Sequence, residues 1–365
     1  MKNFTFLTGL ACALPLLVSA HVLRGNQSQV VRADDAQIRY VGRTQVAQDG
    51  TVTFNWAGTY LESHFTGGKL SVRLSETGTS YYNIFVDDQL HKVVKACGTD
   101  TVIQLVDGVS RGKHKFRMQK RTEGEFGTTS LHAFLLGMRG TMSAVATQPS
   151  RHIEFIGNSL TCGYGVEGLD RDEPFKLETE NCYYSFSNLI PRYFDADYTL
   201  IAHSGRGVIR NYGDSVRLSK GTMNDRLLHT FDQADGEDWN FQQGYRPDLV
   251  VINLGTNDFS TEPHPYKSEF VKGYQQMLTA LRKCYGDIPI LCVFCNTIPE
   301  SVFPFYEEAV KGMNDPHIHL FRMQADLTNE TSDLGAVWHP SKQGHRKMAM
   351  TLIPYIATLM GWNLK

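Results

Sequence analysis

A short apolar run near the middle of the chain ends in polar residues. Residues 153–156 (Ile-Glu-Phe-Ile) are mostly branched or aromatic, which is typical of a buried β-strand. The run stops at Gly157-Asn158-Ser159. Open α/β sheets form their ligand crevice at the carboxyl ends of strands, so the Ser159 hydroxyl is a candidate reactive group. An ordinary turn is the alternative, because Gly, Asn and Ser are common turn residues.

Three later stretches also place polar groups at the ends of predicted elements. Residues 201–208 (Ile-Ala-His-Ser-Gly-Arg-Gly-Val) follow a strand, and their glycines allow the backbone to approach a ligand closely. Residues 249–258 (Leu-Val-Val-Ile-Asn-Leu-Gly-Thr-Asn-Asp) form an apolar strand that ends in hydrogen-bonding groups. Residues 337–341 (Val-Trp-His-Pro-Ser) precede the last predicted helix. Each stretch alone is compatible with a purely structural role.

The elements that must hold these groups differ between the two halves of the chain. From about residue 36 to 140, short runs of alternating apolar and polar residues are separated by Gly, Asp and Asn clusters, the pattern of antiparallel strands. The runs are Thr51–Trp56, Lys69–Leu74, Tyr81–Val86, Val102–Val106, Lys113–Met118 and Leu131–Leu136. Strands at this spacing predict a β-sandwich of jelly-roll type, to which we assign residues 21–145.

After residue 150 the pattern changes to strands that alternate with helices. The predicted strands are Ile153–Ile156, Tyr198–Ala202, Leu249–Leu254 and Pro289–Cys295. One helix is predicted over residues 266–284, ended by Gly286, and a final helix runs from the N-cap Ser341 to about Met360. Alternation of this kind predicts βαβ units, so residues 150–365 should form a three-layer α/β/α domain with a parallel sheet.

Residues 1–20 have the features of a secretory signal peptide. A basic residue precedes an apolar run from Leu7 to Val18, and small residues follow it. We therefore expect a secreted or periplasmic protein.

The formal net charge is −2 and no basic stripe is visible, which argues against a nucleic-acid partner. No other stretch is apolar for long enough to cross a membrane, so we expect no membrane partner, and we expect a monomer.

Six cysteines follow the predicted signal peptide. Cys292 and Cys295 have the spacing of a redox or zinc pair, but they lie in an apolar run and are expected to be buried thiols. Cys162 and Cys182 follow Ser159 at a spacing that permits a disulfide. No cluster of His, Asp and Glu with metal-ligand spacing is visible, so neither a metal nor an organic cofactor is predicted.

The four polar stretches together resemble the SGNH (GDSL-type) hydrolase superfamily, whose sequence blocks supply Ser, Gly, Asn and His in that order. The resemblance covers roughly residues 150–360 and places every block at a predicted strand end or helix start. The amino-acid sequences of residues 157–165, 255–260 and 339–345 are similar to those of carbohydrate esterase family 2. That family pairs an N-terminal jelly roll with a C-terminal SGNH domain, which matches the two halves of this chain.

The resemblance implies a role for each block. Ser159 would be the nucleophile, activated by His339 as general base, and would form an acyl-enzyme. The oxyanion hole would consist of the Ser159 backbone N–H, a backbone N–H of the glycine block and the side-chain amide of Asn257. Within the glycine block, the order of residues favours Gly205 over Gly207 as the donor.

Two positions depart from the superfamily pattern. Asn158 stands where Asp is more frequent, and its amide keeps one acceptor while adding a donor. Ala336 and Val337 occupy the place of the Asp that usually precedes the catalytic histidine, and the nearest upstream acid is Asp333. A main-chain carbonyl can also orient an imidazole, so the sequence predicts a Ser–His dyad.

The family resemblance implies an O-acetyl esterase that acts on plant polysaccharides such as xylan and glucomannan. Trp338 and Trp239 are candidate sugar-binding side chains, with core packing as the alternative for each. Two other functions stay open. One is an SGNH esterase or lipase acting on other small esters, lipids or thioesters, although no long apolar lid segment is visible. The other is a catalytically weak carbohydrate-binding protein.

Overall fold

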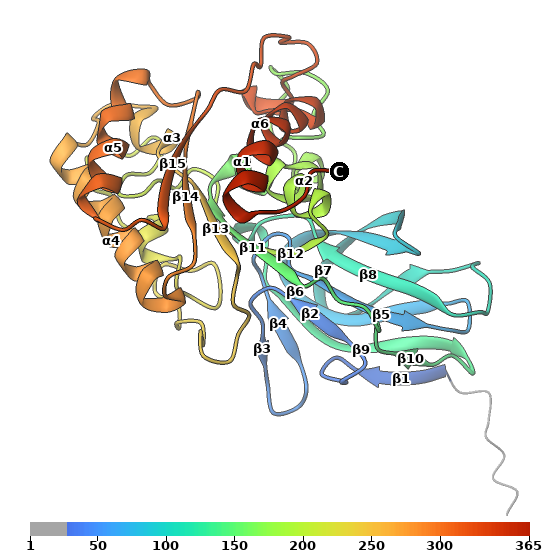
Figure 1. Ribbon diagram of the computed structural model, residues 1–365. Helices are drawn as coiled ribbons and strands as arrows, with labels where there is room; N and C mark the ends of the chain where they lie inside the picture. Colours follow the sequence, from blue (N-terminus) through green and yellow to red (C-terminus); the bar gives the residue numbers. More distant parts are fainter. Residues whose placement is uncertain (1–27) are drawn as a thin grey trace, which may run out of the picture.

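A curled antiparallel sheet forms the first part of the structure. The computed structural model describes residues 28–365, and the predicted signal peptide lies outside this range. The ten strands form one sheet (Figure 1), and an apolar core of its own packs within it. Its strands are β1 (Ser28–Arg32), β2 (Arg39–Val41), β3 (Gln45–Val46), β4 (Val52–Phe54), β5 (Tyr60–Phe65), β6 (Leu70–Val86), β7 (Gln89–Val106), β8 (His114–Lys120), β9 (Thr129–Met138) and β10 (Met142–Ser143). The predicted β-domain is confirmed, and we call it the sandwich domain.

Two strands that the sequence separates are one element in the structure. The predicted runs 69–74 and 81–86 both belong to β6, which is 17 residues long. Residues 75–80 between them stay extended because they pair with β7 and β9. Register shifts within this stretch interrupt the pairing, and such bulges disturb the simple alternation that a sequence pattern can reveal.

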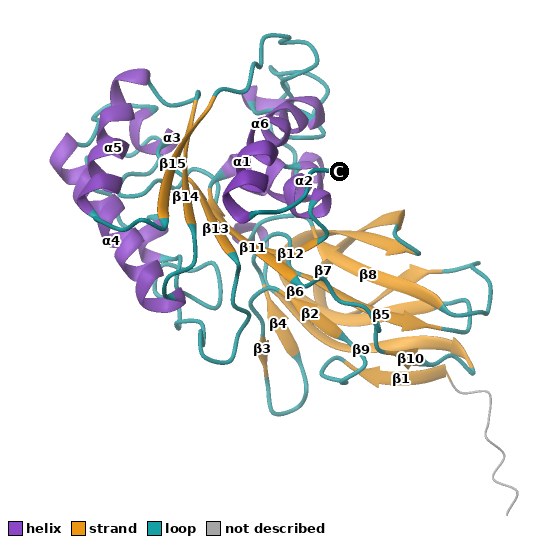
Figure 2. Ribbon diagram, viewed as in Figure 1, coloured by secondary structure: helices purple, strands orange, loops and turns teal. Residues whose placement is uncertain are grey.

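A parallel five-stranded sheet with helices on both faces forms the second part (Figure 2). The strand order is β12-β11-β13-β14-β15. The strands are β11 (Arg151–Gly157), β12 (Ala196–Ala202), β13 (Leu249–Asn253), β14 (Ile290–Cys295) and β15 (Ile318–Met323). The helices are α1 (Ser159–Cys162), α2 (Phe186–Tyr193), α3 (Thr256–Phe259), α4 (Lys267–Tyr285), α5 (Phe303–Gly312) and α6 (Lys342–Met360). This three-layer α/β domain confirms the predicted fold class.

The helices end where the sequence predicts, whereas the sequence pattern of the edge strand β15 is weak. The Ser341 side chain caps α6 by accepting the N–H groups of residues 343 and 344, and Gly286 ends α4. Strand β15 was not predicted, because its residues are mostly half-buried and lack a continuous apolar run. Within residues 28–365, no helix has the length and apolar character of a membrane span.

Three neighbouring strands of the parallel sheet end at the same level. Gly157 of β11 pairs with Ala202 of β12 on one side and with Asn253 of β13 on the other. The segments that follow these strands carry Ser159, the glycine block and Asn257. The register therefore brings three of the four polar blocks to one edge of the sheet.

The sandwich domain covers the edge strand β12 of the parallel sheet. Arg39 Nη1 of β2 lies 3.3 Å from Asp197 Oδ1 of β12. Trp56 is fully buried in the core of the α/β domain, and its indole N–H donates to the Thr230 carbonyl at 3.0 Å. An otherwise open strand edge is thus shielded, and the two domains share one packed interior at this boundary.

The six described cysteines are free thiols. Cys162 Sγ lies 3.5 Å from the Glu123 carboxylate, and Cys182 Sγ lies 3.4 Å from the Lys120 carbonyl. The disulfide that their spacing permits is therefore not formed, because each thiol faces its own acceptor. The Cys-x-x-Cys pair of β14 is buried, as predicted.

Candidate active site

Ser159 and His339 meet at the carboxyl end of the parallel sheet. Ser159 is the first residue of α1, and His339 lies shortly before α6. His339 Nε2 is 2.9 Å from Ser159 Oγ. His339 Nδ1 is 2.8 Å from the carbonyl oxygen of Val337, which can only accept a hydrogen bond. Nδ1 therefore carries the proton, and the free lone pair of Nε2 faces the serine hydroxyl.

A strained turn presents the Val337 carbonyl to the imidazole. Val337 has φ 54° and ψ 41°, and Trp338 has φ 59°, values that bulky residues rarely adopt. The main-chain N–H groups of residues 336–338 donate, at 3.0–3.1 Å, to the carbonyl oxygens of Gly165, Glu173 and Arg171. Strain of about 1–3 kcal/mol per residue persists only where the surroundings enforce it, and it concentrates at functional sites.

Asp333 binds elsewhere and leaves the imidazole to the Val337 carbonyl. Its buried carboxylate accepts hydrogen bonds from Lys347 Nζ at 2.7 Å and from the Asn329 N–H at 2.9 Å. It therefore anchors α6 to the preceding loop. This is the geometry that a dyad requires.

The environment of His339 favours its neutral form. Burial lowers the pKa of His339, although the hydrogen bond to the Val337 carbonyl opposes this effect. A lowered pKa keeps the imidazole basic at pH values below those of a free histidine. Both Ser159 and His339 are only half-buried, so the reacting atoms can be reached from solvent.

The glycine block after β12 exposes one of its two candidate donors. A Cβ at Gly205, which has φ 74°, would meet no atom within 4 Å, so this residue borders open space. A Cβ at Gly207 would lie 2.1 Å from the Arg210 carbonyl oxygen and 2.3 Å from an Asp258 carboxylate oxygen. Gly207 is therefore closely packed where a Cβ would lie, whereas Gly205 is open on that side.

Asn257 and Asp258 tie the glycine block to α3. Asn257 Nδ2 donates to the Arg206 carbonyl at 2.8 Å, which leaves its second amide hydrogen available. The Asp258 carboxylate accepts, at 2.9–3.0 Å, the main-chain N–H groups of Val208, Ile209 and Arg210. Burial raises the pKa of Asp258 to about 6, against the effect of these hydrogen bonds. The sequence motif contains Asp258, but its role as an anchor appears only in the structure.

Asn158 positions the helix that begins with Ser159. It is the N-cap of α1, and its Oδ1 accepts the Leu160 N–H at 3.2 Å. Asn158 is almost completely buried. The residue that replaces the more frequent Asp thus retains the acceptor that a helix N-cap needs.

The two predicted sugar-binding tryptophans lie in different places. Trp338 is adjacent to His339 and 56% exposed, and the Arg171 guanidinium stacks over its ring at 4.1 Å. Trp239 instead lies beside His152, at the amino ends of β11 and β12, where it lines a cavity of about 290 Å³. A strand of this length spans about 20 Å, so Trp239 is not part of the site at Ser159. Its loop has no periodicity from which its path could have been predicted.

Three aromatic side chains to which the sequence analysis gave no role form a wall beside His339. The Tyr164 ring lies 4.8 Å from the His339 ring between centroids, and Phe175 stacks on Tyr164 at 3.9 Å. Phe126, in the 3₁₀ turn Gly124–Phe126, lies 5.6 Å from Phe175. Because Phe126 belongs to the sandwich domain, both domains contribute to this wall.

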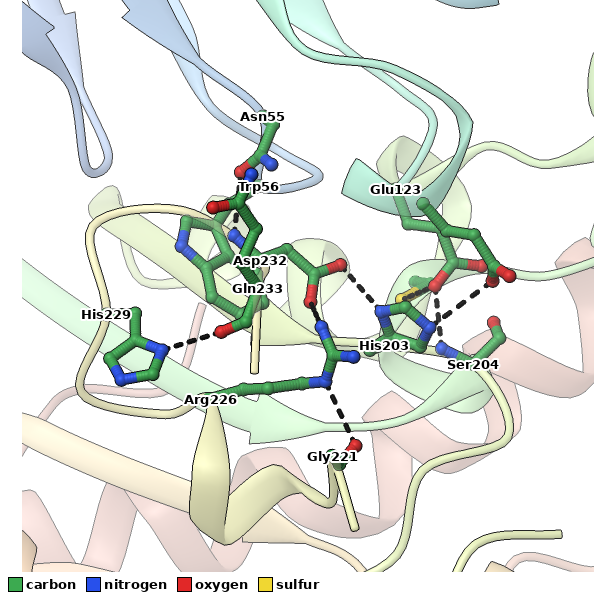
Figure 3. A network of polar contacts seen from close by, with 12 residues as sticks. Asn55, Trp56, Glu123, His203, Ser204, Gly221, Arg226, His229, Asp232 and Gln233 are labelled. Atoms are coloured by element: carbon green, nitrogen blue, oxygen red, sulfur yellow. Dashed lines mark hydrogen bonds and ion pairs between the residues drawn. The ribbon is translucent and has the colours of Figure 1, made fainter. Parts of the chain in front are cut away.

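A charged cluster lies where the sandwich domain meets the glycine block (Figure 3). His203 Nδ1 is 2.7 Å from the Asp232 carboxylate, and His203 Nε2 is 3.3 Å from Glu125. Burial lowers the pKa of His203, but the hydrogen bond and charge of Asp232, followed by the contact with Glu125 and the charge of Glu123, raise it to about 9. His203 is therefore protonated near neutral pH.

Glu123, Glu125 and His203 are also the described residues that could hold a metal ion, since their ligand atoms lie within 4.8 Å of one another. No sequence motif indicated this group, because its members come from two domains. The carboxylates around His203 already have cationic partners, because His203 pairs with Glu125 and Asp232, and Arg226 also pairs with Asp232. The close contact with His203, and then the charges of Arg206 and Arg226, lower the pKa of Glu125. The cluster thus fits a protonated histidine better than a metal ion.

Comparisons with known families divide the chain as the fold does. Residues 40–145 match the family described as Carbohydrate esterase 2 N-terminal, and residues 155–347 match the GDSL-like Lipase/Acylhydrolase family. A solved structure of a family two carbohydrate esterase from Clostridium thermocellum, in complex with cellohexaose, is 31% identical with a TM-score of 0.82. The match covers 89% of this chain and 100% of that chain. This chain belongs to carbohydrate esterase family 2.

Two further relatives of this family 2 esterase have names of the same kind. The cellulase/esterase CelE of Acetivibrio thermocellus is 31% identical over 92% of this chain, which spans 41% of the length of CelE. An acetylxylan esterase / glucomannan deacetylase of Cellvibrio japonicus is 25% identical, over 92% of this chain and 93% of that protein. The α/β domain is accordingly that of a carboxylic ester hydrolase.

Proposed function

We propose that this esterase removes O-acetyl groups from plant polysaccharides such as xylan and glucomannan. The observation that carries the proposal is the 2.9 Å approach of His339 Nε2 to Ser159 Oγ at a solvent-accessible strand end. The dyad alone supports ester hydrolysis in general. The polysaccharide comes from the relatives, because the Cellvibrio japonicus protein is named for xylan and glucomannan.

The proposed reaction has two halves that use the same ring nitrogen. Ser159 Oγ attacks the acetyl carbonyl while His339 Nε2 takes the serine proton. The imidazolium gives this proton to the departing sugar oxygen, and an acetyl group remains on Ser159. Nε2 then takes a proton from water, which attacks the acetyl group and releases acetate as the proton returns to Oγ. The Val337 carbonyl holds Nδ1–H throughout and so fixes the tautomer.

Three donors would stabilise the negative charge on the carbonyl oxygen. The Ser159 N–H is at the first position of α1, where helix geometry provides no acceptor. The Gly205 N–H has no acceptor among the described residues, and Asn257 has one amide hydrogen beyond its bond to Arg206. One such donor is typically worth about 3–4 kcal/mol in the transition state.

The aromatic wall supports a carbohydrate as the alcohol part of the ester. Tyr164, Phe175 and Phe126 extend from His339 as half-buried, flat surfaces, which suit the apolar faces of sugar rings. Trp338, which directly precedes His339 and is 56% exposed, is a further candidate for contact with the sugar. A polysaccharide substrate also agrees with export, which we propose from residues 1–20.

The proposal is tested by acetate release from acetylated xylan and acetylated glucomannan. Wild-type protein should release acetate from at least one of them faster than it hydrolyses long-chain esters. Ser159→Ala should abolish release while leaving the melting temperature unchanged, because the nucleophile is required for the acetyl-enzyme. Hydrolysis of long-chain esters alone would overturn the polysaccharide assignment.

Binding experiments separate an esterase from a carbohydrate-binding protein. Ser159→Ala should still bind acetylated oligosaccharides, measured by calorimetry, because the aromatic wall is intact. Saturable glycan binding by wild-type protein without any acetate release would contradict the enzymatic proposal.

A further inference from the structure

A glutamate from the sandwich domain binds the peptide that precedes Gly205. Glu123 follows β8, and its Oε2 accepts the Ser204 N–H at 2.6 Å (Figure 3). Glu123 is completely buried, and its Oε1 has no hydrogen-bond partner within residues 28–365. The Glu123 carboxylate is therefore shielded from water at this contact, which strengthens its hydrogen bond to the Ser204 N–H.

The neighbouring contacts hold the rest of this segment. The Gly205 carbonyl accepts the Tyr212 N–H at 2.9 Å. The Arg206 N–H donates to the His203 carbonyl at 3.3 Å, and the Arg206 carbonyl accepts from Asn257 Nδ2 at 2.8 Å. In the described part of the chain, the main-chain N–H groups of Gly205 and Gly207 find no acceptor, and of these two glycines only Gly205 borders open space.

We propose that Glu123 is a positioning residue for the oxyanion hole, and that the sandwich domain is thereby part of the active site. Its hydrogen bond fixes the rotation of the peptide between His203 and Ser204, and with it the direction of the following N–H. Gly205 depends on such support, because glycine has the widest conformational freedom of all residues. The inference rests on the proposed function, since it assigns Glu123 a part in stabilising the same transition state.

The charged cluster keeps the Glu123 contact in place. His203 is held by Asp232, and the other Asp232 oxygen accepts from Arg226 Nη1 at 3.0 Å. Asn55, again from the sandwich domain, accepts the Asp232 N–H at 2.9 Å. Figure 3 shows Glu123 on one side of the His203 ring and Asp232 with Arg226 on the other. The glycine block is thus fastened at two points to the sandwich domain.

General stabilisation of the domain boundary is the competing explanation. Trp56 offers a matched control, because its indole N–H binds the Thr230 carbonyl across the same boundary and makes no hydrogen bond to residues 203–206. Trp56→Phe removes this interdomain hydrogen bond and keeps a large aromatic ring. If Glu123 only stabilises the boundary, Glu123→Ala and Trp56→Phe should change activity in the same way.

The decisive experiment compares turnover of a small acetate ester by four proteins. Relative to wild type, Glu123→Ala should lower kcat by about 10- to 100-fold with KM changed less than about twofold, because a misdirected donor acts in the transition state. Glu123→Gln keeps an acceptor oxygen for Ser204 and should stay within about fivefold of wild type. Trp56→Phe should lower the melting temperature but retain kcat.

Hydrogen–deuterium exchange gives a second readout that does not need turnover. Peptides covering residues 203–206 should exchange faster in Glu123→Ala than in Glu123→Gln or Trp56→Phe, while strands β11 and β13 stay protected in all three. Wild-type kcat and wild-type exchange in Glu123→Ala would overturn the inference and leave the proposed function standing. A wild-type protein without any ester turnover would refute the proposed function, and the exchange pattern would still decide the positioning claim.

A metal at the same cluster is the remaining alternative. The melting temperature of wild-type protein should be the same in chelator, in added zinc and in added calcium. A metal-dependent increase that Glu123→Gln abolishes would replace the positioning role with a metal site.

Discussion

His339 is oriented by main-chain groups of its own domain, whereas Gly205 is oriented by buried side chains, one of them from the sandwich domain. On the histidine side, carbonyl oxygens of the loop after α1 hold a strained turn, and the Val337 carbonyl fixes Nδ1–H. On the glycine side, Glu123 holds the Ser204 N–H beside the protonated His203. The two arrangements serve one reaction, but one consists of main-chain groups and the other of charged side chains.

Main-chain groups do not titrate, so the orientation of His339 should not depend on pH. The glycine side contains acidic groups around an imidazole whose pKa is raised to about 9, so its integrity depends on a proton. The position of His339 should thus depend on the shape of the backbone, and the position of Gly205 on the charge of nearby side chains. Four substitutions test this difference.

Asn257→Ala should have the largest effect, because Asn257 both supplies a donor and binds the Arg206 carbonyl of the glycine side. We expect kcat to fall by about 10²–10³ with little change in KM. Steady-state kinetics on an acetate ester measure this, with the exposed Asn240→Ala as control. A change confined to KM would make Asn257 a substrate-binding residue.

Gly168→Ala tests the histidine side through backbone shape alone. A Cβ at Gly168 would lie 2.4 Å from the Ala336 nitrogen, so the turn that carries His339 must shift. A displacement of about 1 Å can cost about 10²-fold in rate, and we expect a kcat loss of that order. Gly236→Ala is the matched control, because its Cβ would meet its nearest atoms at 3.5 Å. Unchanged kcat in a folded Gly168→Ala protein would contradict the main-chain support.

Asp333→Asn should change kcat by less than about tenfold, whereas loss of a true triad acid can cost about 10⁴. The reason is that Asp333 binds Lys347 rather than His339. In both proteins the acidic limb of kcat/KM should have its midpoint below the ordinary histidine pKa of about 6.5, because burial lowers the pKa of His339. A loss near 10⁴ in folded Asp333→Asn would overturn the dyad.

His203→Gln tests the charge dependence of the glycine side through stability. Because the folded pKa of His203 is raised to about 9, its contribution is complete below the unfolded pKa of about 6.5 and disappears as pH rises through 9. The free energy of unfolding of wild type, measured by urea titration, should fall by at most about 3 kcal/mol over this window. His203→Gln should show a smaller decrease. If the unfolding free energies of wild type and His203→Gln fell in parallel with pH, the neighbours of His203 would not raise its pKa.

The positions of the four polar blocks could be predicted from short stretches of sequence, whereas their chemical roles were implied by the resemblance to a family. Ser159, Gly205, Asn257 and His339 each follow a strand or precede a helix, and periodicity places such elements reliably because they depend on local geometry. The absence of an acid beside His339 was readable as well, since Ala336 and Val337 occupy its usual place. The α/β fold followed from the same alternation, except for the half-buried edge strand β15.

Only the tertiary structure decided which loops meet. Trp239 lies at the far end of β11, whereas Phe126 and Glu123 reach the active site from another domain. Likewise, the charge of His203 depends on carboxylates brought together by folding. Periodicity describes the conformation of neighbouring residues, but the docking of two domains and the pKa of a buried group depend on contacts between residues far apart in the chain. For that reason the sequence determined which polar residues end the strands, and the tertiary structure decided what holds them in position.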